Sequence, residues 1–156
     1  MTIYFLYYGA LIGIGVLLQL AGVLKNNRGR AVYLILVGIT LTAIGGARDF
    51  GVSYDGTTYA EVFDRFAASA WIPPQKYTFF MEYGFYVLCK LIATLGGTAR
   101  TMFGVTSAFV AVSVCVFIYQ NTQQTLFAVV ILLSFPFFYT SFDLIRYYLA
   151  ISIVLL

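Results

Sequence analysis

The stretch RDFGVSYDGTTYAEVFDRF, residues 48–66, interrupts an otherwise hydrophobic chain and decides how its fold is interpreted. Its six charged residues are Arg48, Asp49, Asp55, Glu61, Asp64 and Arg65. The whole chain has nine basic and six acidic residues; it is 62% hydrophobic and 10% charged, whereas soluble domains are about 45–50% apolar and about 25% charged. The composition therefore predicts an all-α membrane protein with this stretch outside the hydrocarbon layer.

About five apolar segments are predicted to span the membrane. They are Ile3–Leu24, Ala31–Ala47, Met102–Tyr119, Leu126–Thr140 and a final run from Leu144. The first is about 33 Å long as a helix, enough to cross a bilayer. Short basic loops stay in the cytoplasm, so KNNRGR at residues 25–30 predicts that the N-terminus and residues 48–101 lie outside. The final run reaches only about 20 Å. We therefore expect residues 1–156 to be one transmembrane domain, the N-terminal part of a longer polytopic protein.

Two amphipathic juxtamembrane helices are predicted in this first outer loop. The first, Thr57–Ala70, places Val62, Phe63 and Phe66 opposite its charged side chains. The second runs from Glu82 to about Leu95 and ends at Gly96-Gly97.

The second of these helices leaves the topology open. At about 21 Å it is short for a hydrocarbon core of about 30 Å, and Lys90 near its middle would cost about 2.5–3.5 kcal/mol to insert. Both observations favour a helix in the interface, and the alternative is a thin span with a snorkelling Lys90. In the interfacial arrangement Arg146 reaches the same face as Arg48 and Asp55; in the spanning arrangement it reaches the opposite face.

Several kinds of chemistry are excluded or disfavoured by residue content. The chain lacks histidine, and with it the usual general base and the commonest metal ligand. Cys89 and Cys115 lie in apolar segments without disulfide or metal-ligand spacing, which predicts a packing role. The net charge of +3 is concentrated in the topology-setting loop, so no nucleic-acid partner is predicted. No cofactor is predicted, although Asp49 and Asp55 could together hold a divalent cation.

Charged residues at the segment boundaries are the candidate functional groups, because ionisable side chains at a membrane are costly and often functional. Asp55 can serve as a general base beside Arg48 as a phosphate ligand, or it can cap the following helix. Arg146 can pair with Asp143 at i, i+3, or it can receive an anionic head group such as a lipid-linked phosphate. Glu82 at the start of its helix can simply complement the helix dipole.

Four short motifs together resemble those of the EpsG family. They are GGAR ending at Arg48, VSYDGTTYAEVFDRF with Asp55 and Tyr59, EYGFYVLCKLI beginning at Glu82, and FDLIRYYLA with Arg146. The EpsG family comprises bacterial exopolysaccharide polymerase-like membrane proteins, which are similar to the Wzy O-antigen polymerases. The chain departs from the family pattern at Tyr147, where a glutamine is usual, and before Asp55, where a glycine is usual.

The resemblance implies a glycosyltransferase that joins undecaprenyl-pyrophosphate-linked saccharide units on the outer face of the bacterial inner membrane. It implies lipid-linked oligosaccharides, membrane lipids and other polysaccharide assembly proteins as partners. On this reading Asp55 is the catalytic base, and Arg48 and Arg146 bind the pyrophosphate. The remaining substrate-binding candidates are Tyr59, Asp49 and Glu82.

Two other readings stay open: a transporter or flippase component for lipid-linked or anionic substrates, and a scaffold whose charges only fix topology. A transferase predicts that charges from separate segments converge beside a lateral opening to lipid. A transporter predicts charges near the bilayer midplane.

Overall fold

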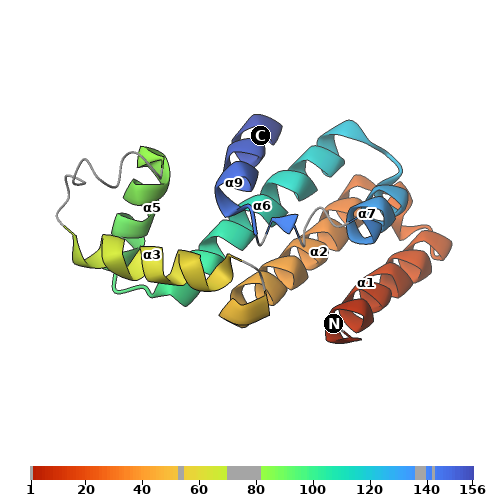
Figure 1. Ribbon diagram of the computed structural model, residues 1–156. Helices are drawn as coiled ribbons and strands as arrows, with labels where there is room; N and C mark the ends of the chain where they lie inside the picture. The colour runs from red at the N-terminus through yellow and green to blue at the C-terminus, as the bar shows by residue number, and fades with distance from the viewer. Residues whose placement is uncertain (1, 53–54, 70–81, 136–139, 142) are drawn as a thin grey trace.

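The computed structural model describes residues 2–52, 55–69, 82–135, 140–141 and 143–156. In these ranges the chain is helical and has no strand, so the all-α prediction is confirmed. The α-helices are α1 (Thr2–Leu20), α2 (Asn27–Ala47), α3 (Gly56–Ala68), α5 (Tyr83–Thr94), α6 (Ala99–Asn121), α7 (Thr125–Ser134) and α9 (Ile145–Leu155) (Figure 1). The sequence also predicts a kink at Pro136 in the apolar run 126–140, but Pro136 lies outside the described residues.

Helices α2 and α6 form the central antiparallel pair of the fold (Figure 1). At one end a Cβ built on Gly46 would lie 3.1 Å from the Cα of Gly104, so a larger residue would push the two backbones slightly apart. At the other end Arg30 of α2 reaches Tyr119 of α6. Helices α1 and α7 pack together beside this pair and contribute to its apolar core. Cys115 is buried in this core, and Cys89 in a second one.

Arg30 fastens the end of α6 to the start of α2. It is 2% exposed, and its guanidinium donates hydrogen bonds to the carbonyl oxygens of Tyr119 and Thr122 and to the side chains of Thr125 and Gln123. Carbonyls at a helix C-terminus lack partners within the helix, so the arginine supplies them. The prediction of a loop over residues 25–30 is therefore wrong for its last part, because α2 begins at Asn27 and Arg30 lies inside it.

The two predicted amphipathic helices pack together at the Gly46 end of the α2–α6 pair, as α3 and α5. Helix α5 ends where Gly96 adopts a left-handed φ of 79°, as the Gly-Gly signal predicted. In α3, Glu61 and Arg65 form an exposed i, i+4 ion pair of 3.3 Å, consistent with a wet face.

Lys90 does not snorkel. It is 5% exposed, and its Nζ donates hydrogen bonds to the carbonyl oxygens of Ala67, at 3.0 Å, and of Ser69. The lysine therefore caps the C-terminal end of α3, where a cation also complements the helix dipole. These hydrogen bonds offset the free-energy cost of burying the charge of Lys90. The sequence indicates only that cost, because the acceptors come from another helix.

Two helices, α2 and α6, are long and apolar enough to cross a membrane. The other apolar helices in the described ranges are shorter, so a count of about five spanning segments is not confirmed and stays a prediction.

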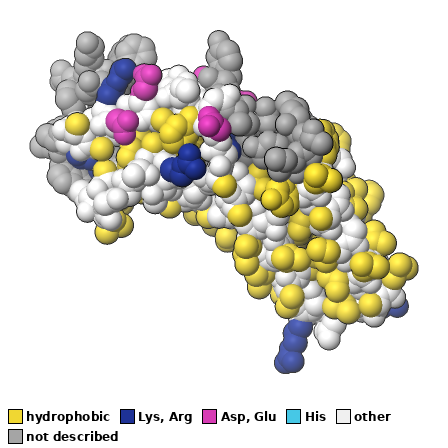
Figure 2. Space-filling model, turned by 90° about the horizontal axis from the view of Figure 1, so that it is seen from below, with side chains coloured by type: hydrophobic (Ala, Val, Ile, Leu, Met, Phe, Trp, Pro, Cys, Tyr) yellow, Lys and Arg dark blue, Asp and Glu magenta, His cyan; other side chains and the backbone are white. Residues whose placement is uncertain are grey.

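Large apolar side chains point outward over much of the surface, for example Leu17 (67% exposed) and Ile39 (63% exposed). Figure 2 shows hydrophobic side chains over much of the elongated body and acidic side chains gathered toward one end. This distribution is expected of a chain that faces lipid.

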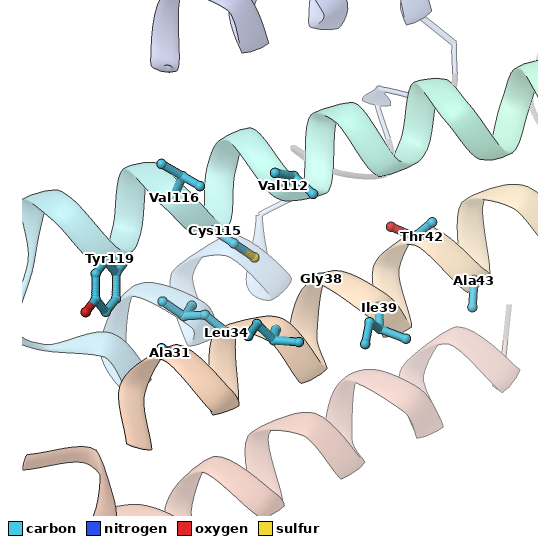
Figure 3. Close-up of a pocket in the computed structure, with 11 residues that line it drawn as sticks. Ala31, Leu34, Gly38, Ile39, Thr42, Ala43, Val112, Cys115, Val116 and Tyr119 are labelled. Atoms are coloured by element: carbon cyan, nitrogen blue, oxygen red, sulfur yellow. The ribbon is translucent and has the colours of Figure 1, made fainter. Parts of the chain in front are cut away.

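An apolar groove of about 540 Å³ runs along one side of the α2–α6 pair (Figure 3). Leu34, Ile39, Val112 and Val116 line it, and no charged side chain does. This groove therefore lacks the groups that acid–base chemistry or the binding of an anion requires.

Candidate functional site

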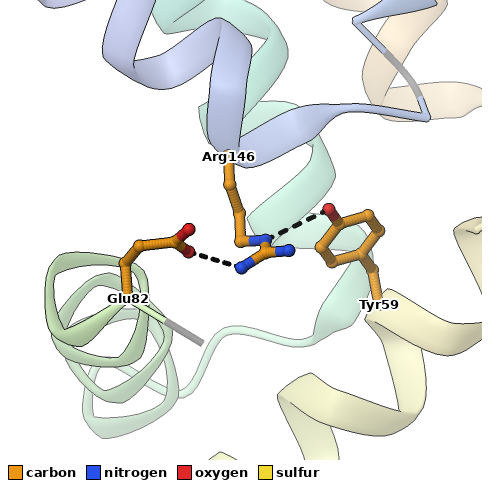
Figure 4. Close-up of polar contacts among 3 residues, drawn as sticks. All are labelled: Tyr59, Glu82 and Arg146. Atoms are coloured by element: carbon orange, nitrogen blue, oxygen red, sulfur yellow. Dashed lines mark hydrogen bonds and ion pairs between the residues drawn. The ribbon is translucent and has the colours of Figure 1, made fainter. Parts of the chain in front are cut away.

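Three residues from three separate segments meet: Tyr59 of α3, Glu82 just before α5, and Arg146 of α9 (Figure 4). Arg146 Nη1 and Glu82 Oε2 form an ion pair of 2.5 Å, and Arg146 Nε donates a longer hydrogen bond of 3.4 Å to the Tyr59 hydroxyl. The sequence named all three as substrate-binding candidates, and the structure brings them together although they lie far apart in the chain. We refer to Tyr59, Glu82 and Arg146 as the arginine cluster.

Local structure fixes each member of the arginine cluster. Tyr59 lies in the first turn of α3 and is 5% exposed, with its ring packed edge-on against Phe85 at a centroid distance of 5.7 Å. Glu82 stands at the N-cap position of α5 without a side-chain capping hydrogen bond, and its carboxylate forms the ion pair with Arg146. Arg146 is the second residue of α9.

Asp143 lies before α9 begins, so Asp143 and Arg146 do not share one helix. Arg146 also has a partner far away in the chain, because Glu82, 64 positions before it, accepts a hydrogen bond from its guanidinium. Such a pair cannot be recognised from helical spacing.

Electrostatics keep the ion pair in its charged form. Partial burial disfavours the ionised carboxylate of Glu82, but a backbone hydrogen bond and the Arg146 guanidinium outweigh it, and the pKa of Glu82 lies below its ordinary value of 4.5. The guanidinium of Arg146 stays protonated at any ordinary pH, and it donates hydrogen bonds to Tyr59 and Glu82. Arginine is therefore a permanent cation here.

Arg48 lies at the same end of the bundle as the arginine cluster but is held inside. It is 4% exposed, and its Cζ lies 4.5 Å from the centre of the Phe103 ring, a cation–π arrangement. With Ser107, Ser141 and Ile145 it lines a small polar hollow. Because Ile145 adjoins Arg146, the two arginines lie at one end, which is the arrangement expected if residues 82–95 do not span.

The polar lining of this hollow was not predicted from the sequence. Thr106 and Ser107 are buried polar neighbours within the long apolar helix α6, and both line the hollow beside Arg48. The Thr-Ser pair in an apolar run is the signal that could have located it.

The two candidate aspartates, Asp49 and Asp55, make local backbone contacts and are not members of the arginine cluster as defined above. Asp49 is exposed and its Oδ1 accepts a hydrogen bond of 2.9 Å from the Gly51 N–H, a local turn. Asp55 stands at the N-cap position of α3 without a side-chain capping bond, and its carbonyl oxygen accepts the Tyr59 N–H. Among the described residues no three acidic or cysteine side chains come together as a metal site.

A second groove, of about 570 Å³, begins at the arginine cluster and is bounded by α5, α6 and α9. Glu82 and Arg146 are the charged residues in its lining, and its walls are otherwise almost entirely apolar. We call it the lateral groove. It joins a permanent cation to a hydrophobic trough, which suits a ligand with an anionic head and an apolar body.

The helical fold, its outward apolar surface and this charged site beside an apolar groove define a helical membrane protein with a polar site at one end of the bundle. The sequence matches the EpsG family over residues 31–156, and the chain belongs to that family. The resemblance read from the four motifs is thereby confirmed. Family membership makes it a membrane protein of exopolysaccharide biosynthesis with a polymerase-like role. Neither the curated proteins nor the solved structures contain a match to this chain.

Proposed function

We propose that this chain carries the substrate site of a polysaccharide polymerase that joins undecaprenyl-pyrophosphate-linked saccharide units on the outer face of the bacterial inner membrane. The observation that carries the proposal is the convergence of Tyr59, Glu82 and Arg146, from three separate segments, beside the lateral groove. A transferase acting on lipid-linked substrates needs this combination of a charged pocket and a route to lipid. A transporter instead needs charged groups along a path near the bilayer midplane.

In the reaction, a hydroxyl oxygen of the acceptor saccharide attacks the anomeric carbon of the donor. A new glycosidic C–O bond forms, and the bond between the anomeric carbon and the pyrophosphate oxygen breaks. Asp55 takes the hydroxyl proton as general base. The electron pair leaves with the lipid pyrophosphate, whose growing negative charge Arg146 stabilises.

Arg48 takes a supporting part in this scheme. Its guanidinium is enclosed near the first turn of α9, so it contributes positive potential to the site and holds that turn in place. Direct contact with the pyrophosphate is assigned to Arg146, whose side chain is 22% exposed.

The proposal is tested with Arg146→Ala and Arg48→Ala in a cell that makes the polymer, with Arg65→Ala as the matched control. Arg65 is an exposed arginine of the same end, paired only with Glu61 among the contacts described for it. Polymer on a sizing gel is expected to disappear in the first two variants and persist in the control, at equal protein levels by immunoblot. Polymer of normal length in both test variants would refute the assignment.

The leaflet in which unpolymerised units accumulate separates polymerase from flippase. If Arg146→Ala blocks polymerisation, lipid-linked units collect in the outer leaflet and react with an impermeant periodate-type label. If they collect in the inner leaflet, the transporter reading replaces ours.

A further inference from the structure

The lateral groove and the arginine cluster have the geometry of a single-chain lipid site. On α9 the groove is lined at Arg146, Ala150 and Ile153, positions that recur at about one-turn intervals on one helix face. The spacing from Arg146 to Ile153 corresponds to about 10 Å along the helix axis. The groove therefore extends lengthwise from its charged end instead of forming a round pocket.

The opposite walls continue the same trough. Phe85 and Leu88 come from α5, and Val105 and Phe109 from α6. Val105 is 41% exposed and Ile153 67% exposed, so these side chains form an accessible apolar surface. Its volume of about 570 Å³ falls within the range of about 300–1,000 Å³ that is usual for small-molecule sites.

The charged end of the lateral groove contains an anionic group of the protein itself, the Glu82 carboxylate. The Glu82 carboxylate lies 2.5 Å from Arg146, while the Glu82 side chain itself is 62% exposed and the Arg146 side chain only 22%. The carboxylate can therefore swing into water at little cost, whereas the guanidinium stays in place. A phosphate has the same charge sign and accepts the same forked donors of an arginine.

We infer that the lateral groove binds the isoprenoid chain of a polyprenyl pyrophosphate, and that its pyrophosphate binds Arg146 by displacing Glu82. The inference rests on the proposed function and adds the location of the lipid chain and a role for Glu82. Glu82 is a substitute anion that keeps Arg146 paired and oriented until the lipid arrives. An isoprenoid chain fits better than a phospholipid because the groove is one elongated trough leading from one cation.

Gly84 provides the test of the groove. It lines the groove, and a Cβ at this position meets no atom within 4 Å, so Gly84→Leu has room at its Cβ and adds bulk to the trough. Gly13 of α1 is the matched control, because a Cβ there also meets nothing within 4 Å and it lies away from the groove. The probes are farnesyl pyrophosphate, inorganic pyrophosphate and dioleoyl phosphatidylglycerol, titrated into the full chain in nanodiscs of uncharged lipid.

Each variant has a distinct expected result. Gly84→Leu weakens farnesyl pyrophosphate binding about tenfold and leaves inorganic pyrophosphate binding unchanged, while Gly13→Leu changes neither. Arg146→Gln weakens both pyrophosphate probes by about tenfold or more, as expected for charge-assisted hydrogen bonds. Glu82→Gln strengthens both, because the competing carboxylate is gone. Phosphatidylglycerol displaces little farnesyl pyrophosphate from the native protein.

The inference is overturned if Gly84→Leu binds farnesyl pyrophosphate like the native protein, or if phosphatidylglycerol displaces it completely, which would assign the groove to a phospholipid. Equal binding of pyrophosphate by Glu82→Gln and native protein would overturn the displacement role. Helical circular dichroism and thermal unfolding confirm that each variant is folded. These binding results are independent of polymer formation in cells, so the groove assignment and the polymerase assignment can fail separately.

Discussion

Replacement of Arg30 by methionine tests whether this residue is a structural clamp or only a topology signal. Methionine fills a similar volume but donates no hydrogen bond. It leaves the Thr125 hydroxyl and the carbonyl oxygens of Tyr119 and Thr122 without their donor. The exposed arginine two residues earlier, Arg28, is the matched control, because Arg28→Met removes the same charge from the same turn.

The magnitude follows from the contacts. A hydrogen bond to a charged group contributes about 1.5–3 kcal/mol. The bond from Nε to Thr125 is buried, whereas those to Tyr119 and Thr122 are partly open, so water can replace some of their contribution. We therefore expect Arg30→Met to lower the free energy of unfolding by about 3 kcal/mol in total. Because about 1 kcal/mol shifts Tm by about 2–4 °C in a chain of this size, we expect Arg30→Met to lower Tm by about 6–12 °C.

The assay is thermal unfolding of the purified protein in detergent, followed by helical circular dichroism. Arg30→Lys keeps the charge but loses the planar fork, so it is expected to recover only part of the loss. A Tm for Arg30→Met equal to that of Arg28→Met would show that the clamp contributes nothing and would refute the reasoning.

Three further outcomes follow from other contacts. Lys90→Met removes the donors that cap α3, and we expect a loss of about 2 kcal/mol together with faster hydrogen exchange in α3 than in α6; unchanged exchange in α3 would contradict this. Gly46→Val forces α2 away from the backbone of Gly104 and is expected to cost about 1–3 kcal/mol in unfolding free energy. Gly9→Val, at a position open to at least 4 Å, serves as its control. For Glu82 the pKa in the folded protein lies below its ordinary value of 4.5. The ionised carboxylate therefore contributes fully to stability above pH 4.5, and this contribution is lost as the pH falls through the lower folded pKa. The Tm difference between native protein and Glu82→Gln is therefore expected at pH 7 and should vanish in strong acid; a difference that persists there would show that the ion pair is not its cause.

The helices could be predicted largely from apolar runs and their interruptions. Gly96-Gly97 ends α5 as its sequence indicated, and α3 begins within one residue of the prediction. The first apolar run is an exception, because α1 ends at Leu20 and a separate 3-10 helix covers Val23–Lys25, so a single helix from Ile3 to Leu24 is wrong. Another failure concerns a charged residue beside an apolar run. The basic segment 25–30 is typical of a cytoplasmic loop, but acceptors at the end of α6 and in the following loop hold Arg30 inside a helix.

The candidate site shows a similar limit. Charge at segment boundaries singled out Glu82 and Arg146 individually, and helical spacing then suggested Asp143 as the arginine's partner. The observed pair depends on how α5 and α9 pack against α6, which is tertiary information that no local spacing contains. The hollow around Arg48 was missed for the same reason, since its lining comes from segments far apart in the chain.

The contacts of Lys90 also determine how the arginine cluster can open. Lys90 binds the last carbonyls of α3, and the hydroxyls of Ser69 and Tyr86 lie 2.8 Å apart, so α5 is tied to the end of α3 at two points. Tyr59 lies in α3, Glu82 immediately precedes α5, and Arg146 belongs to α9. If α3 and α5 move together, Tyr59 and Glu82 leave Arg146 at the same time, so we expect these two contacts to break cooperatively.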